Sequence, residues 1–175
     1  METKRHQFSF VNVGGATRVN IQSGEDIRHL GELDEKMWTV LSCPVTGLEI
    51  SDKTLSYVDV DGDGKIHTGD VVATAEWLCD VLKTPDVILE NKADLLLSEI
   101  NQDSEKGKLL YDAAVQILKN LGKAEAESVS VEDTADSMKI FAQTRFNGDG
   151  VITTKSTDDA DLQKLIEEAV KATGG

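Results

Sequence analysis

The chain has few of the residues that mark several common classes of protein. Its two cysteines, Cys43 and Cys79, have neither the spacing nor the neighbours of a metal site or a redox pair. No stretch approaches the ~20 consecutive apolar residues that a membrane-spanning helix needs. The polar start, Met-Glu-Thr-Lys-Arg-His-Gln, leads into no apolar run of signal-peptide length. We therefore expect a cytoplasmic protein.

Positive charge is also scarce. The sequence has 18 Lys and Arg residues against 32 Asp and Glu, which gives a formal net charge of −14. This excess of negative charge disfavours nucleic acids and anionic membranes as partners and favours cations. The sequence also offers no nucleophile beside a base, no histidine cluster and no phosphate-binding loop. We expect that the protein is not an enzyme.

What the sequence does contain is a run of regularly spaced carboxylates over residues 59–70, Asp-Val-Asp-Gly-Asp-Gly-Lys-Ile-His-Thr-Gly-Asp. Asp59, Asp61 and Asp63 take positions one, three and five, and Asp70 takes position twelve. A hard divalent cation needs six or more oxygen ligands, and a tightly wound loop can aim alternate residues inward. Gly64 at position six allows the positive φ that lets the chain wrap around an ion.

Two further residues complete the expected ligand set. The backbone carbonyl of Lys65 at position seven would bind the ion directly, and His67 at position nine would act through a water molecule. We expect Ca²⁺ at this site, with Mg²⁺ as an alternative, because Asp70 is one methylene shorter than the usual final Glu. The predicted metal ligands are therefore Asp59, Asp61, Asp63, Lys65, His67 and Asp70.

The segments on both sides of this loop have helical patterns. Residues 51–58 form a short entering helix, and residues 68–83 place Val71, Ala75, Leu78 and Leu82 on one face. Helix, twelve-residue loop and helix together resemble the EF-hand superfamily, and the loop with Asp at position twelve also resembles a dockerin repeat. The resemblance implies a calcium-binding module, structural or regulatory, that binds one Ca²⁺. The alternative is a protein-interaction module, dockerin-like or calcium-sensor-like, whose partner binding depends on Ca²⁺.

A second stretch, residues 145–156, repeats the pattern of the first loop, because Asp149 follows Asp63 by 86 residues. Asn147 and Asp149 keep positions three and five, but Arg145 and Ser156 replace the carboxylates at positions one and twelve. Since ligand charge sets affinity, this loop is degenerate.

Two roles remain open for this degenerate loop. It is at most a weak second metal site, whose candidate residues are Asn147, Asp149 and Val151. The interpretation that we favour is a brace, in which Ile152 pairs with Ile66 across a short two-stranded contact.

With 175 residues the chain is long enough for one sizeable core, so we expect a single domain over residues 1–175. It would consist of a β-hairpin in 1–22, a first half in 23–90 with loop 59–70, and a second half in 91–175 with loop 145–156. The expected fold is mainly α, with paired EF-hand-like helix–loop–helix units separated by extra helices and a small N-terminal β-hairpin. Residues 87–97 fit either short helices or a strand.

A second resemblance concerns the completeness of the chain. Residues 33–49, together with the two loops, resemble the N-terminal region of large uncharacterised bacterial proteins that carry EF-hand-like motifs. This resemblance implies that the chain is a piece of a longer protein whose further domains could be its partners. It implies no particular activity.

Overall fold

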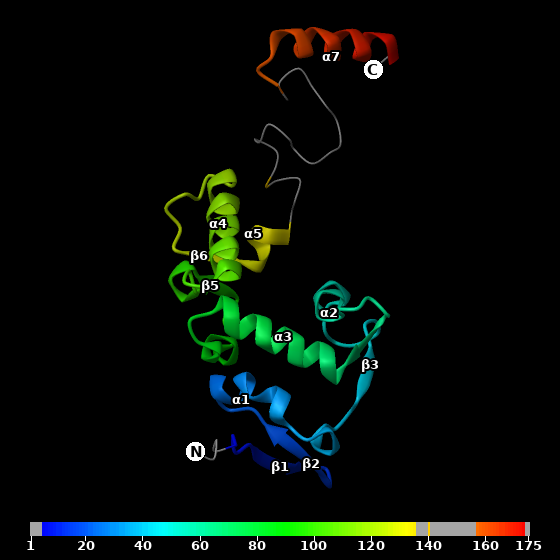
Figure 1. Cartoon of the computed structure of the whole chain (residues 1–175), viewed down its shortest axis with the longest axis vertical. Helices are drawn as coiled ribbons and strands as arrows, with labels where there is room; N and C mark the ends of the chain where they lie inside the picture. Colours follow the sequence, from blue (N-terminus) through cyan, green and yellow to red (C-terminus); the bar gives the residue numbers. More distant parts are fainter. Residues whose placement is uncertain (1–4, 136–139, 141–156, 174–175) are drawn as a thin grey trace. The chain divides into compact units, whose positions relative to one another are not determined.

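The structure, a computed structural model, describes residues 5–135, 140 and 157–173. It combines helices with three two-stranded antiparallel sheets, β1–β2, β3–β4 and β5–β6 (Figure 1). The expectation of a mainly α fold of paired EF-hand-like units with one N-terminal hairpin is therefore wrong, because strands recur along the chain. The two additional sheets were missed because their strands have three residues each, too few for an alternating pattern to be recognised.

The chain divides into two compact units, the first with residues 1–92 and 99–108 and the second with residues 93–98 and 109–175. The elements of the first unit are β1 (Ser9–Val13), β2 (Ala16–Asn20), α1 (Gly24–Arg28), η1 (Leu30–Glu32), η2 (Glu35–Met37), β3 (Ser42–Pro44), α2 (Asp52–Val58), β4 (Lys65–His67), α3 (Thr68–Val81) and η3 (Pro85–Glu90). The elements of the second unit are β5 (Asp94–Leu96), β6 (Ser128–Ser130), α5 (Val131–Ala135) and α7 (Ala160–Thr173). Two elements, η4 (Leu97–Glu99) and α4 (Glu105–Asn120), contribute residues to both units.

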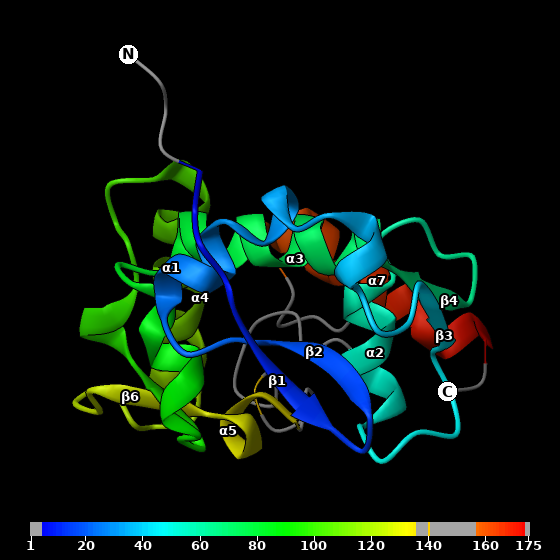
Figure 2. The ribbon, with the colours of Figure 1, turned by 90° about the horizontal axis from the view of Figure 1, so that it is seen from below.

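The N-terminal hairpin β1–β2 has the predicted position. Val13 is opposite Ala16, so the turn consists of Gly14 and Gly15 alone (Figure 2). Both glycines have a positive φ, 60° and 84°. A two-residue hairpin turn of type I′ requires this conformation at both positions, and glycine adopts it without a steric penalty.

Helix α1 begins with a capping box formed by Ser23 and Asp26. The backbone N–H of Asp26 donates to Ser23 Oγ at 3.3 Å, and the N–H of Ser23 donates to Asp26 Oδ2 at 3.0 Å. Burial acts to raise the pKa of Asp26, but hydrogen bonds from the Gln22 N–H and the His6 ring outweigh it and lower the pKa. The helix stops at Arg28, and the 3-10 helices η1 and η2 follow it.

The two helices beside loop 59–70 follow the sequence patterns. Helices α2 and α3 match the helices predicted over 51–58 and 68–83. The ambiguous stretch 87–97 contains both alternatives, because η3 ends at Glu90 and β5 occupies Asp94–Leu96. Among the residues described, no helix is both long and apolar enough to cross a membrane.

The core of the first unit gathers around α3. Its buried apolar side chains come from α2, β4 and α3, from the residues directly after η1 and α3, and from the segment 99–101. They are Leu33, Leu55, Ile66, Ala75, Val81, Leu82 and Ile100. The end of α3 is tied to that segment by backbone hydrogen bonds, from Lys83 to Glu99 at 2.9 Å and from Asn101 to Val81 at 2.8 Å. The loop that precedes α3 is therefore attached to a well-anchored helix.

A close approach between α1 and η3 requires glycine at position 24. The Gly24 N–H donates to Asp86 Oδ1 at 2.8 Å. A Cβ atom at residue 24 would lie 2.7 Å from Asp86 Oδ2 and 2.8 Å from the Asp86 backbone nitrogen. The side chain could rotate away, but the backbone of η3 would have to move.

We predict that Gly24→Ala lowers the free energy of unfolding by about 1–3 kcal/mol, the usual cost of overpacking. Urea denaturation monitored by circular dichroism measures this change. Gly69→Ala is the matched control, since a Cβ at residue 69 meets no atom within 4 Å, and it should leave stability unchanged or raise it by up to ~1 kcal/mol. Equal stability of the two variants would contradict the proposed contact.

Candidate metal site

The loop 59–70 lies between α2 and α3 and is fixed at both ends. Helix α2 ends at Val58, and the N–H of Asp59 still donates to the Leu55 carbonyl at 3.0 Å. The other end enters β4 and then α3, which begins at Thr68. Leu55 and Ile66 are buried at 5% and 6% exposure, so each end of the loop is held by an apolar anchor.

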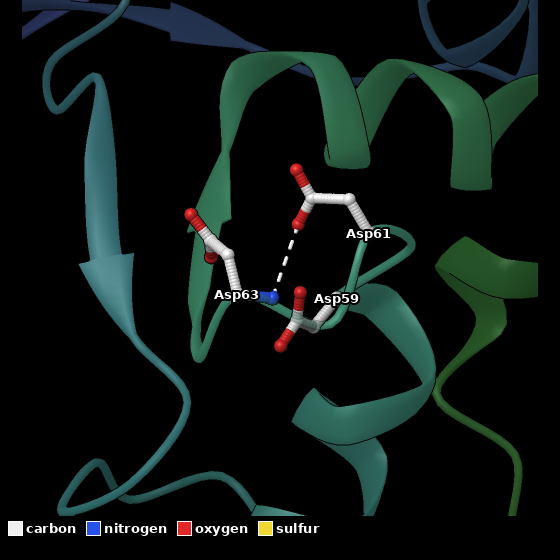
Figure 3. A group of neighbouring side chains, drawn as sticks. All are labelled: Asp59, Asp61 and Asp63. Carbon is white, nitrogen blue, oxygen red and sulfur yellow. Dashed lines mark hydrogen bonds between the residues drawn. The ribbon is translucent and has the colours of Figure 1, made fainter.

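Three of the predicted ligands converge in this loop. Asp59, Asp61 and Asp63 each place a carboxylate oxygen within 4.8 Å of the others (Figure 3). Asp59 is half-buried, whereas Asp61 and Asp63 are exposed. Two unit charges at this separation repel each other by about 1 kcal/mol in water and by more in a medium of lower dielectric constant. The cluster can therefore hold a metal ion, which would offset this repulsion.

Backbone N–H groups hold the three carboxylates in place. Asp59 accepts from Gly62 at 2.9 Å and from Gly64 at 3.0 Å, one bond on each oxygen. Asp61 Oδ1 accepts from the N–H of Asp63 at 3.2 Å (Figure 3). Each carboxylate oxygen has two lone pairs, so these bonds leave acceptor capacity for a cation.

The carboxylate of Asp63 interacts with two polar groups of the following residues. Its Oδ1 accepts from the N–H of Lys65 at 2.8 Å, and its Oδ2 lies 3.1 Å from His67 Nε2. The His67 contact, followed by the Lys65 N–H, lowers the pKa of Asp63. The carboxylate therefore stays ionised to lower pH than an isolated aspartate.

Two glycines give the loop its winding. Gly62 and Gly64 have φ values of 71° and 83°. Their N–H groups both donate to Asp59, so the positive φ turns the backbone around the first carboxylate. Sequence analysis identified Gly64 for this role but did not single out Gly62.

The remaining predicted ligands, Lys65, His67 and Asp70, are not among the three converging carboxylates. Asp70 is buried, at 7% exposure, and does not belong to the group of three carboxylates. Its Oδ2 accepts from the His67 N–H at 2.7 Å and its Oδ1 from the Val60 N–H at 3.2 Å, so it caps α3 and closes the loop. Lys65 and His67 are in β4. The predicted roles of the Lys65 carbonyl and of a water beside His67 stay predictions.

The strand within the loop pairs with β3. Cys43 lies opposite Ile66, and the N–H of Val45 donates to the Gly64 carbonyl at 3.3 Å. Because hydrogen-bonded pairs alternate along an antiparallel ladder, the N–H and C=O of Ile66 face Cys43. Among the described residues the partner of Ile66 is therefore Cys43 of β3. The predicted partner, Ile152, lies outside the described residues. No sequence pattern indicated β3, which is the three-residue run Ser-Cys-Pro.

The second predicted loop lies outside the described residues. This applies to Arg145, Ser156 and Ile152 and to the candidate ligands Asn147, Asp149 and Val151. A weak metal site and a bracing role for loop 145–156 stay predictions.

Sequence analysis missed one polar cluster, which joins the N-terminal segment to α1 and η1. The His6 and His29 rings stack at 4.7 Å, with an angle of 6° between their planes. His6 Nε2 lies 2.8 Å from Asp26 Oδ1, and His29 Nδ1 lies 2.7 Å from Glu32 Oε1. The two histidines are 23 residues apart, since 29 − 6 = 23, so no local pattern connects them. Each ring is bound by a carboxylate, and the cluster holds the start of the chain to α1.

Comparisons of the chain with family models, with curated proteins and with solved structures found no match. The site is therefore interpreted from its own geometry.

The hydrogen bonds distinguish the role of Asp70 from that of Asp61. We predict that, in the presence of a chelator, Asp70→Asn lowers the free energy of unfolding by about 1–3 kcal/mol. Asn has one accepting oxygen, so one of the two backbone N–H groups loses its partner. Asp61→Asn should leave stability unchanged or raise it slightly, since it removes a repelling charge and keeps the oxygen that accepts from Asp63. Chemical denaturation of both variants tests this, and a larger loss for Asp61→Asn would contradict it.

Proposed function

We propose that this chain is a calcium-binding module with an EF-hand-type loop, structural or regulatory in role, which binds one Ca²⁺ at residues 59–70. The observation that carries the proposal is the convergence of Asp59, Asp61 and Asp63 within 4.8 Å. They lie in a loop that positive-φ glycines have already wound. The helices α2 and α3 on either side support the same assignment.

The chemistry of the donors favours a hard cation. All three converging side chains are carboxylates, which suit Ca²⁺ and Mg²⁺ better than softer metals. Ca²⁺ accepts six to eight oxygens in flexible geometry, so the Lys65 carbonyl, Asp70 and water could complete its shell. Mg²⁺ requires near-ideal octahedral geometry and remains the alternative ion.

The affinity should be modest because of Asp70. Both of its oxygens already accept a backbone hydrogen bond. Movement of this carboxylate toward an ion would stretch the bonds that cap α3. Ion binding should also raise the stability of the fold, since an ion that binds only the folded chain stabilises it by about 2.7 kcal/mol when its concentration is 100 times its Kd.

We predict that calorimetry finds one Ca²⁺ per chain and that Asp59→Asn weakens binding at least about tenfold, or ~1.4 kcal/mol. The substitution removes one of three converging charges while it keeps the shape of the side chain. Asp112→Asn is the matched control, because Asp112 is an exposed aspartate of α4. A thermal melt with Ca²⁺ and with chelator gives an independent measure. Absence of Ca²⁺ binding by the unsubstituted chain, or an equal loss in both variants, would reject the proposal.

A calcium-dependent interaction module is the second candidate. A pocket of about 330 Å³ lies against the start of α3, and Thr68 and Gly69, which precede Asp70, contribute to it. Its apolar lining includes Leu30, Leu33, Trp38 and Val72. A shift of α3 on ion binding would change this pocket, which is how a sensor would couple the ion to a partner.

Dye binding separates these two candidates. If the chain is a sensor, the fluorescence of an apolar dye should rise on addition of Ca²⁺, because sensors expose apolar surface when the ion binds. Our first proposal predicts that fluorescence stays within experimental error of the chelated sample. The Asp59→Asn variant controls for effects of Ca²⁺ on the dye itself.

A further inference from the structure

The second unit contains a segment that matches the second half of loop 59–70 position by position. Residues 122–133 follow α4 as residues 59–70 follow α2. When both stretches are numbered from one to twelve, β4 and β6 each occupy positions seven to nine, and α3 and α5 each begin at position ten.

The strand pairing also matches. Position eight is opposite the centre of a three-residue strand in both cases, Ile66 opposite Cys43 and Val129 opposite Leu95. In each sheet, the residue two beyond that centre donates its N–H to the carbonyl at position six. These bonds join Val45 to Gly64 at 3.3 Å and Leu97 to Glu127 at 2.8 Å.

Position twelve is a buried aspartate in both segments, Asp70 at 7% and Asp133 at 9% exposure. Each accepts the N–H of position nine on Oδ2, at 2.7 Å from His67 and at 3.0 Å from Ser130. Each accepts a donor from position two on Oδ1. For Asp70 the donor is the Val60 N–H at 3.2 Å, and for Asp133 it is the Lys123 ammonium at 2.5 Å.

The first halves of the two segments differ in the features that bind a cation. Positions one, three and five are Gly122, Ala124 and Ala126, which have no side-chain oxygen. The backbone also takes another path, because Gly122 has a φ of 73° and none of residues 123–127 has a positive φ. The second segment therefore has the strand and the helix cap of the first without its ion ligands.

We infer that residues 93–135 contain a cation-independent copy of the loop, strand and helix at 59–81, in which the Lys123 ammonium is the built-in counter-charge of Asp133. The first segment brings three further carboxylates together, and an external cation would offset their charge. The second has one buried carboxylate and a lysine of the same loop to neutralise it. This inference concerns other residues than the proposed calcium site and does not depend on it.

The electrostatics support this assignment. The Lys123 hydrogen bond, together with the N–H and hydroxyl of Ser130, lowers the pKa of Asp133 from 3.8 to about 2. The side chain of Lys123 is 55% exposed, whereas that of Asp133 is 9% exposed, so a largely solvated ammonium is paired with a buried carboxylate. The folded state is thus favoured by this pair above pH 3.8, and the contribution is lost as the pH falls toward 2.

Substitution of the lysine in the full chain tests the role of Lys123. In Lys123→Met the apolar stem remains and the charge is removed, so the pKa of Asp133, measured by NMR titration, should rise from about 2 toward 3.8. Hydrogen exchange at the Ser130 amide should become faster, and the urea midpoint should fall. Lys119→Met is the control, because Lys119 is an exposed lysine at the end of α4, and it should change none of these. An Asp133 that titrates near 3.8 in the unsubstituted chain, or equally in both variants, would overturn the inference.

Hydrogen exchange with Ca²⁺ and with chelator tests the independence from cations. Peptides that cover 128–135 should exchange at the same rate in both conditions. Slower exchange of these peptides in Ca²⁺ would overturn the inference. Peptides that cover 59–67 report on the proposed calcium site separately, and a lack of response there would count against that proposal alone.

Discussion

The structure of the candidate site depends on hydrogen bonds from backbone N–H groups to aspartate side chains a few residues earlier in the loop. Gly62 and Gly64 donate to Asp59, Asp63 donates to Asp61, and Lys65 donates to Asp63. These bonds satisfy amide groups that the sharp turns leave without partners. They also bring three negative charges together, which is unfavourable in the absence of a cation. The same contacts that wind the loop therefore assemble a group of carboxylates that could hold a metal ion.

The aspartate at position twelve couples this loop to the fold. Asp70 joins the start of the loop, the strand β4 and the first turn of α3 through two hydrogen bonds. A three-residue strand has few ladder bonds of its own and is weak in isolation. Attachment of the strand to a helix cap stabilises it, and Ser130 and Asp133 use the same attachment in the second unit.

The sequence predicted what depends on local spacing and missed what depends on distant pairing. The carboxylate spacing predicted the convergence of Asp59, Asp61 and Asp63, and the apolar periodicity predicted α3. The pairing of Ile66 with Cys43 was missed, because Ser42–Pro44 has no alternating pattern. Asp70 shows a deeper ambiguity. An acid three residues after the strand end satisfies the spacing of an ion ligand and the spacing of a helix cap equally well, so only the observed hydrogen bonds separate these roles.

The two matching segments share the residues that build the strand and the helix cap and differ in the residues that could hold an ion. Both have an apolar residue at position eight, a strand partner for it and a buried aspartate at position twelve. These shared features build the strand and start the helix, and they need no metal. The difference lies in positions one to five, where three aspartates in one loop correspond to Gly122, Ala124 and Ala126 in the other. Since the lysine at position two meets the buried carboxylate directly, the second loop keeps its helix cap with one internal charge pair. The first loop instead brings three carboxylates together, and a cation would offset their mutual repulsion.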